Sequence, residues 1–254
     1  MNYTLRLASA MCFIGHGAFG LITKAIWCNY FGVFGIGHDL AYRLMPILGS
    51  IDILLGLTIL VYPVRTVFAW LVIWGLFTAS LRPLSGEPFA ELIERAGNFG
   101  APLAFLLLVG FAGGWFVRVR SGGSVSAPLR WSLRITAFLL LLGHGWLTLL
   151  GKKALLDQYT SLGFAHPATV ALWAGLFEVC GALAVLIRPS RSVLIVLLVW
   201  KMASELWYPH YELLEWIERG GSYGVLLALL LSEWKIDRTA SAGRASWKTL
   251  GLST

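Results

Sequence analysis

The sequence predicts an all-α, polytopic membrane protein, in which eight transmembrane helices form two parallel-oriented four-helix bundles about a pseudo-twofold axis along the membrane normal. Three observations support this fold: the composition, internal repetition and the distribution of basic residues. The chain of 254 residues is 57% hydrophobic and 13% charged, whereas soluble domains are about 25% charged. Several apolar runs of about 17–20 residues are each long enough to cross about 30 Å of hydrocarbon.

The expected spans follow one another closely along the chain. They cover residues 6–24, 43–62, 66–82, 97–117, 134–151, 167–187, 192–208 and 219–233. Proline-containing links at 62–65 and 188–191 predict tight cytoplasmic turns, because proline cannot continue a helix. The longer outer connections contain residues 89–95 and 211–219, which we expect to form amphipathic segments at the membrane interface.

Internal similarity is the strongest feature of the sequence. The Gly-His-Gly motif around His16 recurs around His144 at an offset of 128 residues, and the offset falls to 126 through the middle of each copy. After a second slip, residues 93–100 match residues 217–224 at an offset of 124. Ordered matches with only two small slips indicate a duplication.

The duplication divides the chain into two units, each with four spans. Residues 1–121 form the first unit and residues 122–254 the second, which ends in a polar cytoplasmic tail from residue 235 that we expect to be disordered. The linker between them, residues 118–128, is basic and rich in Gly and Ser. Because four spans return the chain to its starting side, both units have the same orientation, unlike the inverted repeats of many transporters.

The basic residues report on orientation rather than on nucleic-acid binding. Twelve lie at the termini or in alternate connections with only two acidic residues, a net charge of +10, while the opposite side carries −1. The positive-inside rule places the basic side, and with it both termini, in the cytoplasm. We therefore expect a multi-pass protein of the bacterial inner (cytoplasmic) membrane that contacts membrane lipids and has no nucleic-acid partner.

Four ionisable residues lie near the midplane of the expected spans: His16, Asp52, His144 and Glu178. A rise of about 1.5 Å per helical residue places them roughly 12–14 Å deep in a core of about 30 Å. An ionisable group at that depth costs several kcal/mol unless it is paired or hydrated, and such groups mark functional sites by default. We therefore treat these four as candidate catalytic residues.

Three roles remain open for them. In the first, His16 bonds to Asp52, and His144 to Glu178, only to hold helices together. In the second, one or both pairs handle protons or bind a ligand, while the carboxylate orients the histidine. In the third, His16 and His144 are cofactor-binding residues that hold one haem b as axial ligands. The sequence has no c-type attachment motif, and a pair of histidines is an unspecific signal, so haem is disfavoured.

A second polar group lies at the outer ends of the expected spans. It comprises His38, Glu91, Glu94, Arg95, His166, His210, Glu215, Glu218 and Arg219. Carboxylates three residues apart share one face of a helix, so these residues form either a polar mouth over each bundle or a solvated rim of weak ion pairs. The spacing contains neither HxxxH nor HExxH, and no metal site is predicted.

The second unit carries its motifs in a recognisable order. Arg134-Ile135 opens its first span, Gly143-His144-Gly145 follows and Lys152 closes it; Glu178 and Gly181 lie in the second span, Arg188-Pro189 at the turn and Gly220-Gly221 at the start of the fourth. This order resembles the DoxX/DoxD-like family of small four-span membrane proteins. The first unit keeps the frame with Asp52 in place of the glutamate, and the resemblance covers residues 5–117 and 133–232.

The resemblance implies a redox setting without specifying the role of a tandem form. One branch of the family resembles the membrane subunit of thiosulfate:quinone oxidoreductase, and others associate with redox partners. Our first hypothesis is a redox-associated inner-membrane subunit that binds a quinone or small apolar ligand at the histidine–carboxylate pairs, with electrons supplied by the ligand or by a redox partner protein. The alternatives are a transporter of a small solute or lipid-like molecule and a non-catalytic scaffold, and any of these forms is compatible with a homo-oligomer.

Overall fold

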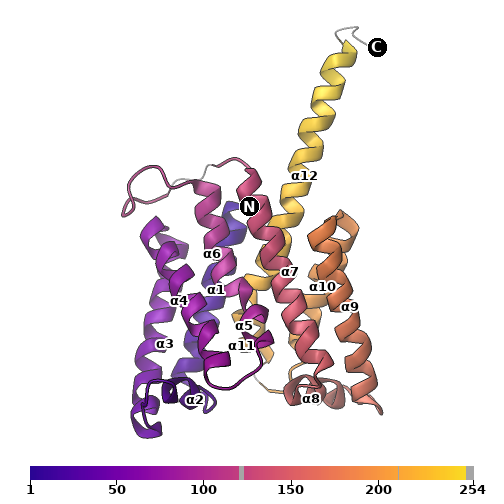
Figure 1. The fold of residues 1–254 in the computed structure, drawn as a ribbon. Helices are drawn as coiled ribbons and strands as arrows, with labels where there is room; N and C mark the ends of the chain where they lie inside the picture. The colour runs from indigo at the N-terminus through magenta and orange to yellow at the C-terminus, as the bar shows by residue number, and fades with distance from the viewer. Residues whose placement is uncertain (120–122, 211, 250–254) are drawn as a thin grey trace.

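The computed structural model describes residues 1–119, 123–210 and 212–249, and the chain in these ranges is helical apart from its connections (Figure 1). The elements are α1 (Asn2–Leu21), α2 (Trp27–Gly32), α3 (His38–Val61), α4 (Arg65–Leu84), α5 (Ala90–Glu94), α6 (Ala96–Val109), α7 (Ala127–Leu149), α8 (Lys153–Ser161), α9 (Pro167–Ile187), α10 (Arg191–Ser204), the 3₁₀ turn η1 (Glu205–Trp207), α11 (Glu212–Glu218) and α12 (Gly220–Thr249). One isolated bridge joins Val64 to Arg118. The all-α prediction is confirmed for the described residues.

Several helices begin where the local sequence favours it. The Ser126 hydroxyl accepts a hydrogen bond from the Leu129 amide at the start of α7, and Ser190 accepts one from Val193 at the start of α10. Such caps satisfy backbone donors that have no partner inside the helix. The turns predicted around Pro63 and Pro189 separate α3 from α4 and α9 from α10.

Several expected boundaries were wrong, two of them by eight residues or more. The fourth span of the first unit was expected to cover 97–117, but α6 ends at Val109 because Gly110 adopts a φ of +72°, which a helix cannot continue. Arg65 then holds the departing chain through a 2.8 Å bond from its Nε to the Gly110 carbonyl. The tail expected to be disordered from residue 235 instead continues α12 to Thr249, in a sequence with no proline to stop it.

Four helices in the described part of the chain are long and apolar enough to cross a membrane: α3, α4, α7 and α9. The α6 helix is a shorter apolar helix of 14 residues. Many large apolar side chains on α3, α4 and α9 are exposed, such as Leu54 (63%), Ile73 (63%) and Trp173 (67%). Apolar surface of this extent is typical of helices that face lipid, so the chain is a membrane protein.

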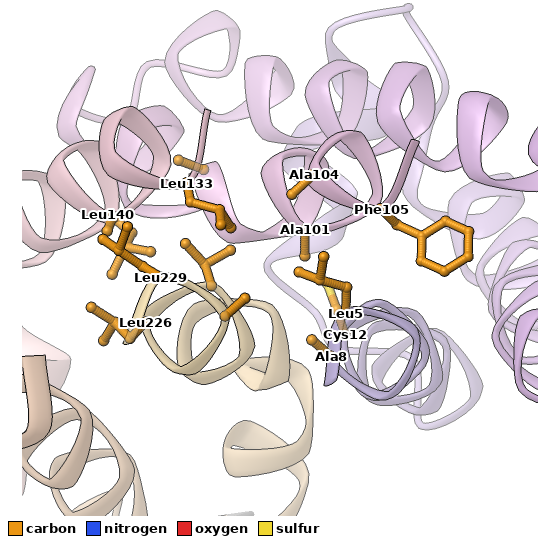
Figure 2. Close-up of a cluster of buried hydrophobic side chains, with 14 of the residues drawn as sticks. Leu5, Ala8, Cys12, Ala101, Ala104, Phe105, Leu133, Leu140, Leu226 and Leu229 are labelled. Atoms are coloured by element: carbon orange, nitrogen blue, oxygen red, sulfur yellow. The ribbon is translucent and has the colours of Figure 1, made fainter. Parts of the chain in front are cut away.

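The hydrophobic core is shared between the two units. The helices α1, α6, α7 and α12 pack against one another at the centre, with α3 and α4 on one side and α9 and α10 on the other. Figure 2 shows Leu5 of α1, Phe105 of α6, Leu133 of α7 and Leu226 of α12 in one buried cluster. The expected pair of self-contained four-helix bundles is therefore replaced by a single central core with two flanks.

Small residues permit this central packing. Gly97 of α6 lies against the backbone of Gly221 in α12, and Gly224 of α12 lies against Ala8 of α1. Small residues let helices approach closely in a membrane, where packing rather than water drives association. Because these glycines face across the two units, the sequence favours one fused body.

The short helices α5 and α11 each pack against the other unit. Gly143 of α7 meets the backbone of Glu94 in α5, and Gly15 of α1 meets the backbone of Glu218 in α11. Both glycines precede a midplane histidine in sequence. We call this mutual packing of α5 on α7 and of α11 on α1 the exchange. It brings a carboxylate-bearing segment of one unit beside the histidine-bearing helix of the other.

Candidate functional site

The first candidate pair forms a hydrogen-bonded triad in the first unit. The Nδ1 atom of His16 lies 2.9 Å from an Asp52 carboxylate oxygen, and the indole N–H of Trp74 donates a 2.8 Å bond to the other oxygen. Asp52 is buried, while the His16 side chain is 16% exposed and stacks on Trp27 with ring centroids 4.5 Å apart. Asp52 thus fixes the orientation of the ring by accepting a hydrogen bond from Nδ1–H, which leaves Nε2 to act on a ligand.

The second candidate pair forms the equivalent triad in the second unit. The Nδ1 atom of His144 lies 2.5 Å from Glu178, whose other oxygen accepts a 2.7 Å bond from the Trp200 indole. The His144 side chain is only 5% exposed. The structure therefore brings together each histidine and carboxylate named from the sequence, and adds a tryptophan to each pair.

A cavity of about 140 Å³ lies beside the first triad. Its walls include His16, Asp52 and Trp74 together with aromatic rings of α2 and α4, such as Phe31 and Phe77. Among the described residues, Nε2 of His16 has no hydrogen-bond partner. A cavity of about 150 Å³ is large enough to hold a benzene ring, so this space fits one ring beside a free imidazole nitrogen.

The polar end of this cavity is formed by Arg82, Arg95 and Asn98. Arg82 donates a 2.7 Å bond to the Tyr30 hydroxyl, which in turn donates a 2.7 Å bond to Glu87. Burial raises the pKa of Tyr30 above its ordinary value even though Arg82 opposes this effect, so the hydroxyl remains a donor. The cavity therefore has an aromatic body and a cationic end.

The expectation of a solvated outer rim was wrong. Glu91, Glu94, Glu215, Glu218 and Arg219 are all buried, with exposures between 1% and 9%. The physical reason is the exchange of α5 and α11, which buries their polar faces against α7 and α1 instead of leaving them at the membrane surface. A carboxylate buried in this way must be paired.

Buried ion pairs connect the two units. Arg95 lies 3.1 Å from Glu91 and 2.6 Å from Glu94, and Glu94 lies 2.7 Å from Arg219 of the second unit. Lys152 also contacts Glu91. Burial by itself would raise the pKa of Glu94, but Arg219 and Arg95 outweigh it and hold that pKa below its ordinary value. The carboxylate is therefore ionised where the two units meet.

A larger hollow of about 460 Å³ lies between the units beside this network, and we call it the vestibule. Its charged lining comprises Lys24, Arg82, Glu87, Glu91, Arg95, Lys152, Glu215, Glu218 and Arg219. The vestibule shares Trp27, Arg82 and Arg95 with the ring-sized cavity. It therefore offers a polar approach to the apolar site.

The three outer histidines do not join the network. His38, His166 and His210 are exposed, and no group of three or more His, Cys, Asp or Glu side chains suited to a metal is found in the part of the chain that the structure describes. The sequence groups them with the other polar residues because they are ionisable and lie at the outer ends of the expected spans. In the structure they lie at the start of α3, just before α9 and in the loop after η1, outside the network.

Sequence reasoning missed two charged residues of the second site. Lys201 and Glu205 are both buried, and their charged atoms lie 2.7 Å apart. Lys201 also lies 3.8 Å from Glu178, and Glu205 lies 4.0 Å from Nε2 of His144. Their i, i+4 spacing inside an expected span was the available signal, since such a pair shares one helix face.

Comparisons with protein-family models, curated proteins and solved structures find no match to this chain. The resemblance to the DoxX/DoxD-like family thus stays a prediction from the motifs. The function must be argued from the geometry of the two triads, the cavity and the ion-pair network.

Proposed function

We propose that eight helices cross the membrane as two parallel repeats related by a pseudo-twofold axis, with both termini in the cytoplasm of a bacterial cell. The four apolar helices α3, α4, α7 and α9 support this, because α1, α6, α10 and α12 pack alongside them in the same body. The chain order also pairs α1 with α7, α3 with α9, α4 with α10 and α6 with α12.

Cysteine labelling tests the orientation. In a chain whose three native cysteines are replaced, a cysteine at Ser124 should react only from the cytoplasmic side and one at Asp157 only from the outside. Ser124 is exposed and the Asp157 side chain is 45% exposed, so the reagent can reach both positions. Reaction of both from the same side would show that α7, the proposed span between them, does not cross the membrane, and would overturn the eight-span arrangement.

We propose further that the chain is a redox-associated membrane subunit that binds a quinone, or a small apolar ligand of similar shape, beside His16. The observation that carries this proposal is the ring-sized cavity of about 140 Å³ next to an imidazole whose Nδ1 is fixed by Asp52 and whose Nε2 is unpartnered in the described structure. Aromatic walls favour a flat ring. The cationic end favours ligand oxygens.

The histidine would exchange a proton with the ligand. Reduction of a quinone to a hydroquinone takes up two electrons and two protons. His16 would donate one proton from Nε2 to a ligand oxygen, with its imidazolium form stabilised by Asp52, and water in the vestibule would supply the second. A redox partner protein would deliver both electrons. In the reverse reaction, oxidation of the hydroquinone would return both electrons to that partner.

Ligand occupancy tests this proposal directly. The purified protein, titrated with a short-chain benzoquinone, should show saturable quenching of tryptophan fluorescence, since Trp27 and Trp74 line the cavity. The double variant His16→Leu/Asp52→Leu should remain folded, because replacing both partners by apolar groups is nearly neutral, but should bind at least tenfold more weakly. The matched control, His144→Leu/Glu178→Leu, should bind as the native chain does. Unchanged binding in the first variant would exclude the site.

Transport of a small solute is the second candidate, and the vestibule favours it. Substrate sites of many transporters lie at the interface between repeats, and the vestibule of about 460 Å³ lies between these two units. Visible spectra and lipid mass spectrometry of the purified protein separate the candidates. Bound quinone supports the redox proposal, a Soret band would indicate haem, and neither would favour transport or a scaffold.

A further inference from the structure

The two candidate sites differ at two pairs of corresponding positions, which lie on α4 in the first unit and on α10 and the start of η1 in the second. Trp74 and Trp200 match at an offset of 126 and bond to the carboxylates of their own triads. At the same offset, Gly75 corresponds to Lys201 and Ala79 corresponds to Glu205. The first unit therefore has a hydrogen atom and a methyl group where the second has an ammonium and a carboxylate.

This difference places two further charged side chains close to His144. In the second unit, Lys201 Nζ lies 2.7 Å from Glu205 and 3.8 Å from Glu178, and Glu205 lies 4.0 Å from Nε2 of His144. The Lys201 and Glu205 side chains are 3% and 1% exposed. Glu205 therefore lies on the Nε2 side of the His144 imidazole, and Lys201 joins it to Glu178.

We infer that the Lys201–Glu205 ion pair closes the second site to ligands, so that the chain binds one ligand at His16 and none at His144. This inference rests on the proposed ligand site of the first unit. In the second unit, the Glu205 carboxylate takes the place beside the imidazole that a ligand oxygen takes in the first. The duplicated units thus share their triads but have different roles.

A hollow on the lipid-facing side of the second unit supports this interpretation. It is lined by Val170, Trp173, Ala174, Phe177 and Trp200, and does not include His144 or Glu178. Trp200 lines the hollow and also donates its indole N–H to Glu178. The apolar hollow therefore reaches the tryptophan of the second triad but not its histidine or carboxylate.

Counting ligands in matched variants tests the inference. Lys201→Gly/Glu205→Ala reproduces the residues of the first unit and should raise the number of short-chain benzoquinone molecules bound per chain from one to two in equilibrium dialysis. Lys201→Met/Glu205→Leu removes the same charges but fills the space, and should leave the number at one. Adding His16→Leu should lower the number of bound ligands to zero in the native chain and to one in the Lys201→Gly/Glu205→Ala variant.

The possible counts separate the inference from the proposed function. Two ligands on the native chain, or one on a folded Lys201→Gly/Glu205→Ala variant, would overturn the closure. No ligand on the native chain at all would instead overturn the proposed function of the first unit.

A measurement on the native chain does not depend on the folding of any variant. Diethyl pyrocarbonate, which acylates accessible imidazole nitrogens, should modify His16 and be blocked there by the benzoquinone, while His144 stays unmodified. The exposed His38 and His166 serve as internal references for full reaction. Modification of His144 at the rate of His16 would show that its Nε2 side is open, and would overturn the closure.

Discussion

The first and second units carry the same triad in different surroundings. His16 and His144 each contact a carboxylate that is also bonded by a tryptophan. Beside His16 there is a cavity with aromatic walls, whereas beside His144 there is a buried ion pair. The comparison teaches that the residues shared by the two copies identify the common framework of the triads. The residues that differ between the copies indicate which copy we propose to bind a ligand.

The same comparison shows that the units depend on each other. Each midplane histidine lies on a helix that packs against a short helix of the other unit, α11 against α1 and α5 against α7. The ion pairs from Arg95 through Glu94 to Arg219 cross the boundary between them. A site in one unit is therefore supported by charges of the other.

Separating the units should have the largest effect. Residues 1–121 and residues 122–254, each expressed alone, should insert into the membrane but be degraded, because Glu94 and Arg219 would each lose the partner on the other half. An isolated buried charge costs several kcal/mol. Co-expression should restore both fragments and allow one to be purified through a tag on the other. A stable, monodisperse 1–121 fragment would contradict the dependence.

Removing one charge of the second site should have the next largest effect. Lys201→Met leaves Glu178 and Glu205 close together without their ammonium, and should lower the free energy of unfolding by about 3–5 kcal/mol. Lys201→Met/Glu205→Leu should recover most of that loss, since no unpaired charge remains at position 205. Thermal unfolding in detergent measures both, and equal stability of native and Lys201→Met proteins would show that the ion pair has no structural role.

The sequence predicted the triads but not the ion pair, and for a physical reason. Matching the two copies finds residues that both retain, such as His16 and His144, and passes over positions like Gly75 and Lys201 where they differ. The burial of Glu94 was missed because it depends on Arg219 and Gly143 of the other unit. The spacing of residues within 89–95 gives no information about those contacts. The continuous match of residues 93–100 with 217–224 was a sign that this segment is constrained.

The packing of the helices shows a similar limit to what the sequence predicts. The all-α class and the membrane location follow from composition and from apolar runs such as 43–62 and 167–187, which correspond to long helices. The shared central core does not follow from them, because every apolar face of a span can contact either lipid or another helix. Helix partners were set instead by small residues such as Gly97 and Gly221.

The contacts of α1 and α7 with the short helices provide a test of symmetry. A side chain added at Gly15 or Gly143 would meet the backbone of Glu218 or Glu94, which cannot move aside as a flexible side chain can. Gly15→Ala and Gly143→Ala should therefore each lower the free energy of unfolding by about 1–3 kcal/mol. Gly32→Ala is the matched control, because nothing lies within 4 Å of a methyl group there. Unequal losses at the two glycines would indicate that only one exchange contact bears on stability.

The tryptophans of the two triads provide the smallest and most discriminating test. Trp74→Phe and Trp200→Phe each remove one indole N–H from a buried carboxylate and keep an aromatic ring in place. Hydrogen bonds between membrane helices contribute about 0.6 kcal/mol on average, so both variants should unfold at nearly the same temperature as the native protein.

Ligand binding should nevertheless separate the two tryptophans. Trp74 lines the cavity and orients Asp52, which holds His16, so Trp74→Phe should weaken benzoquinone binding by about 1 kcal/mol, or roughly fivefold in Kd. Trp200→Phe should leave binding unchanged, because the ligand site that we propose is in the other unit. Equal weakening by both substitutions would mean that the second triad also holds ligand, whereas no weakening by either would mean that Asp52 does not need its indole partner to orient His16.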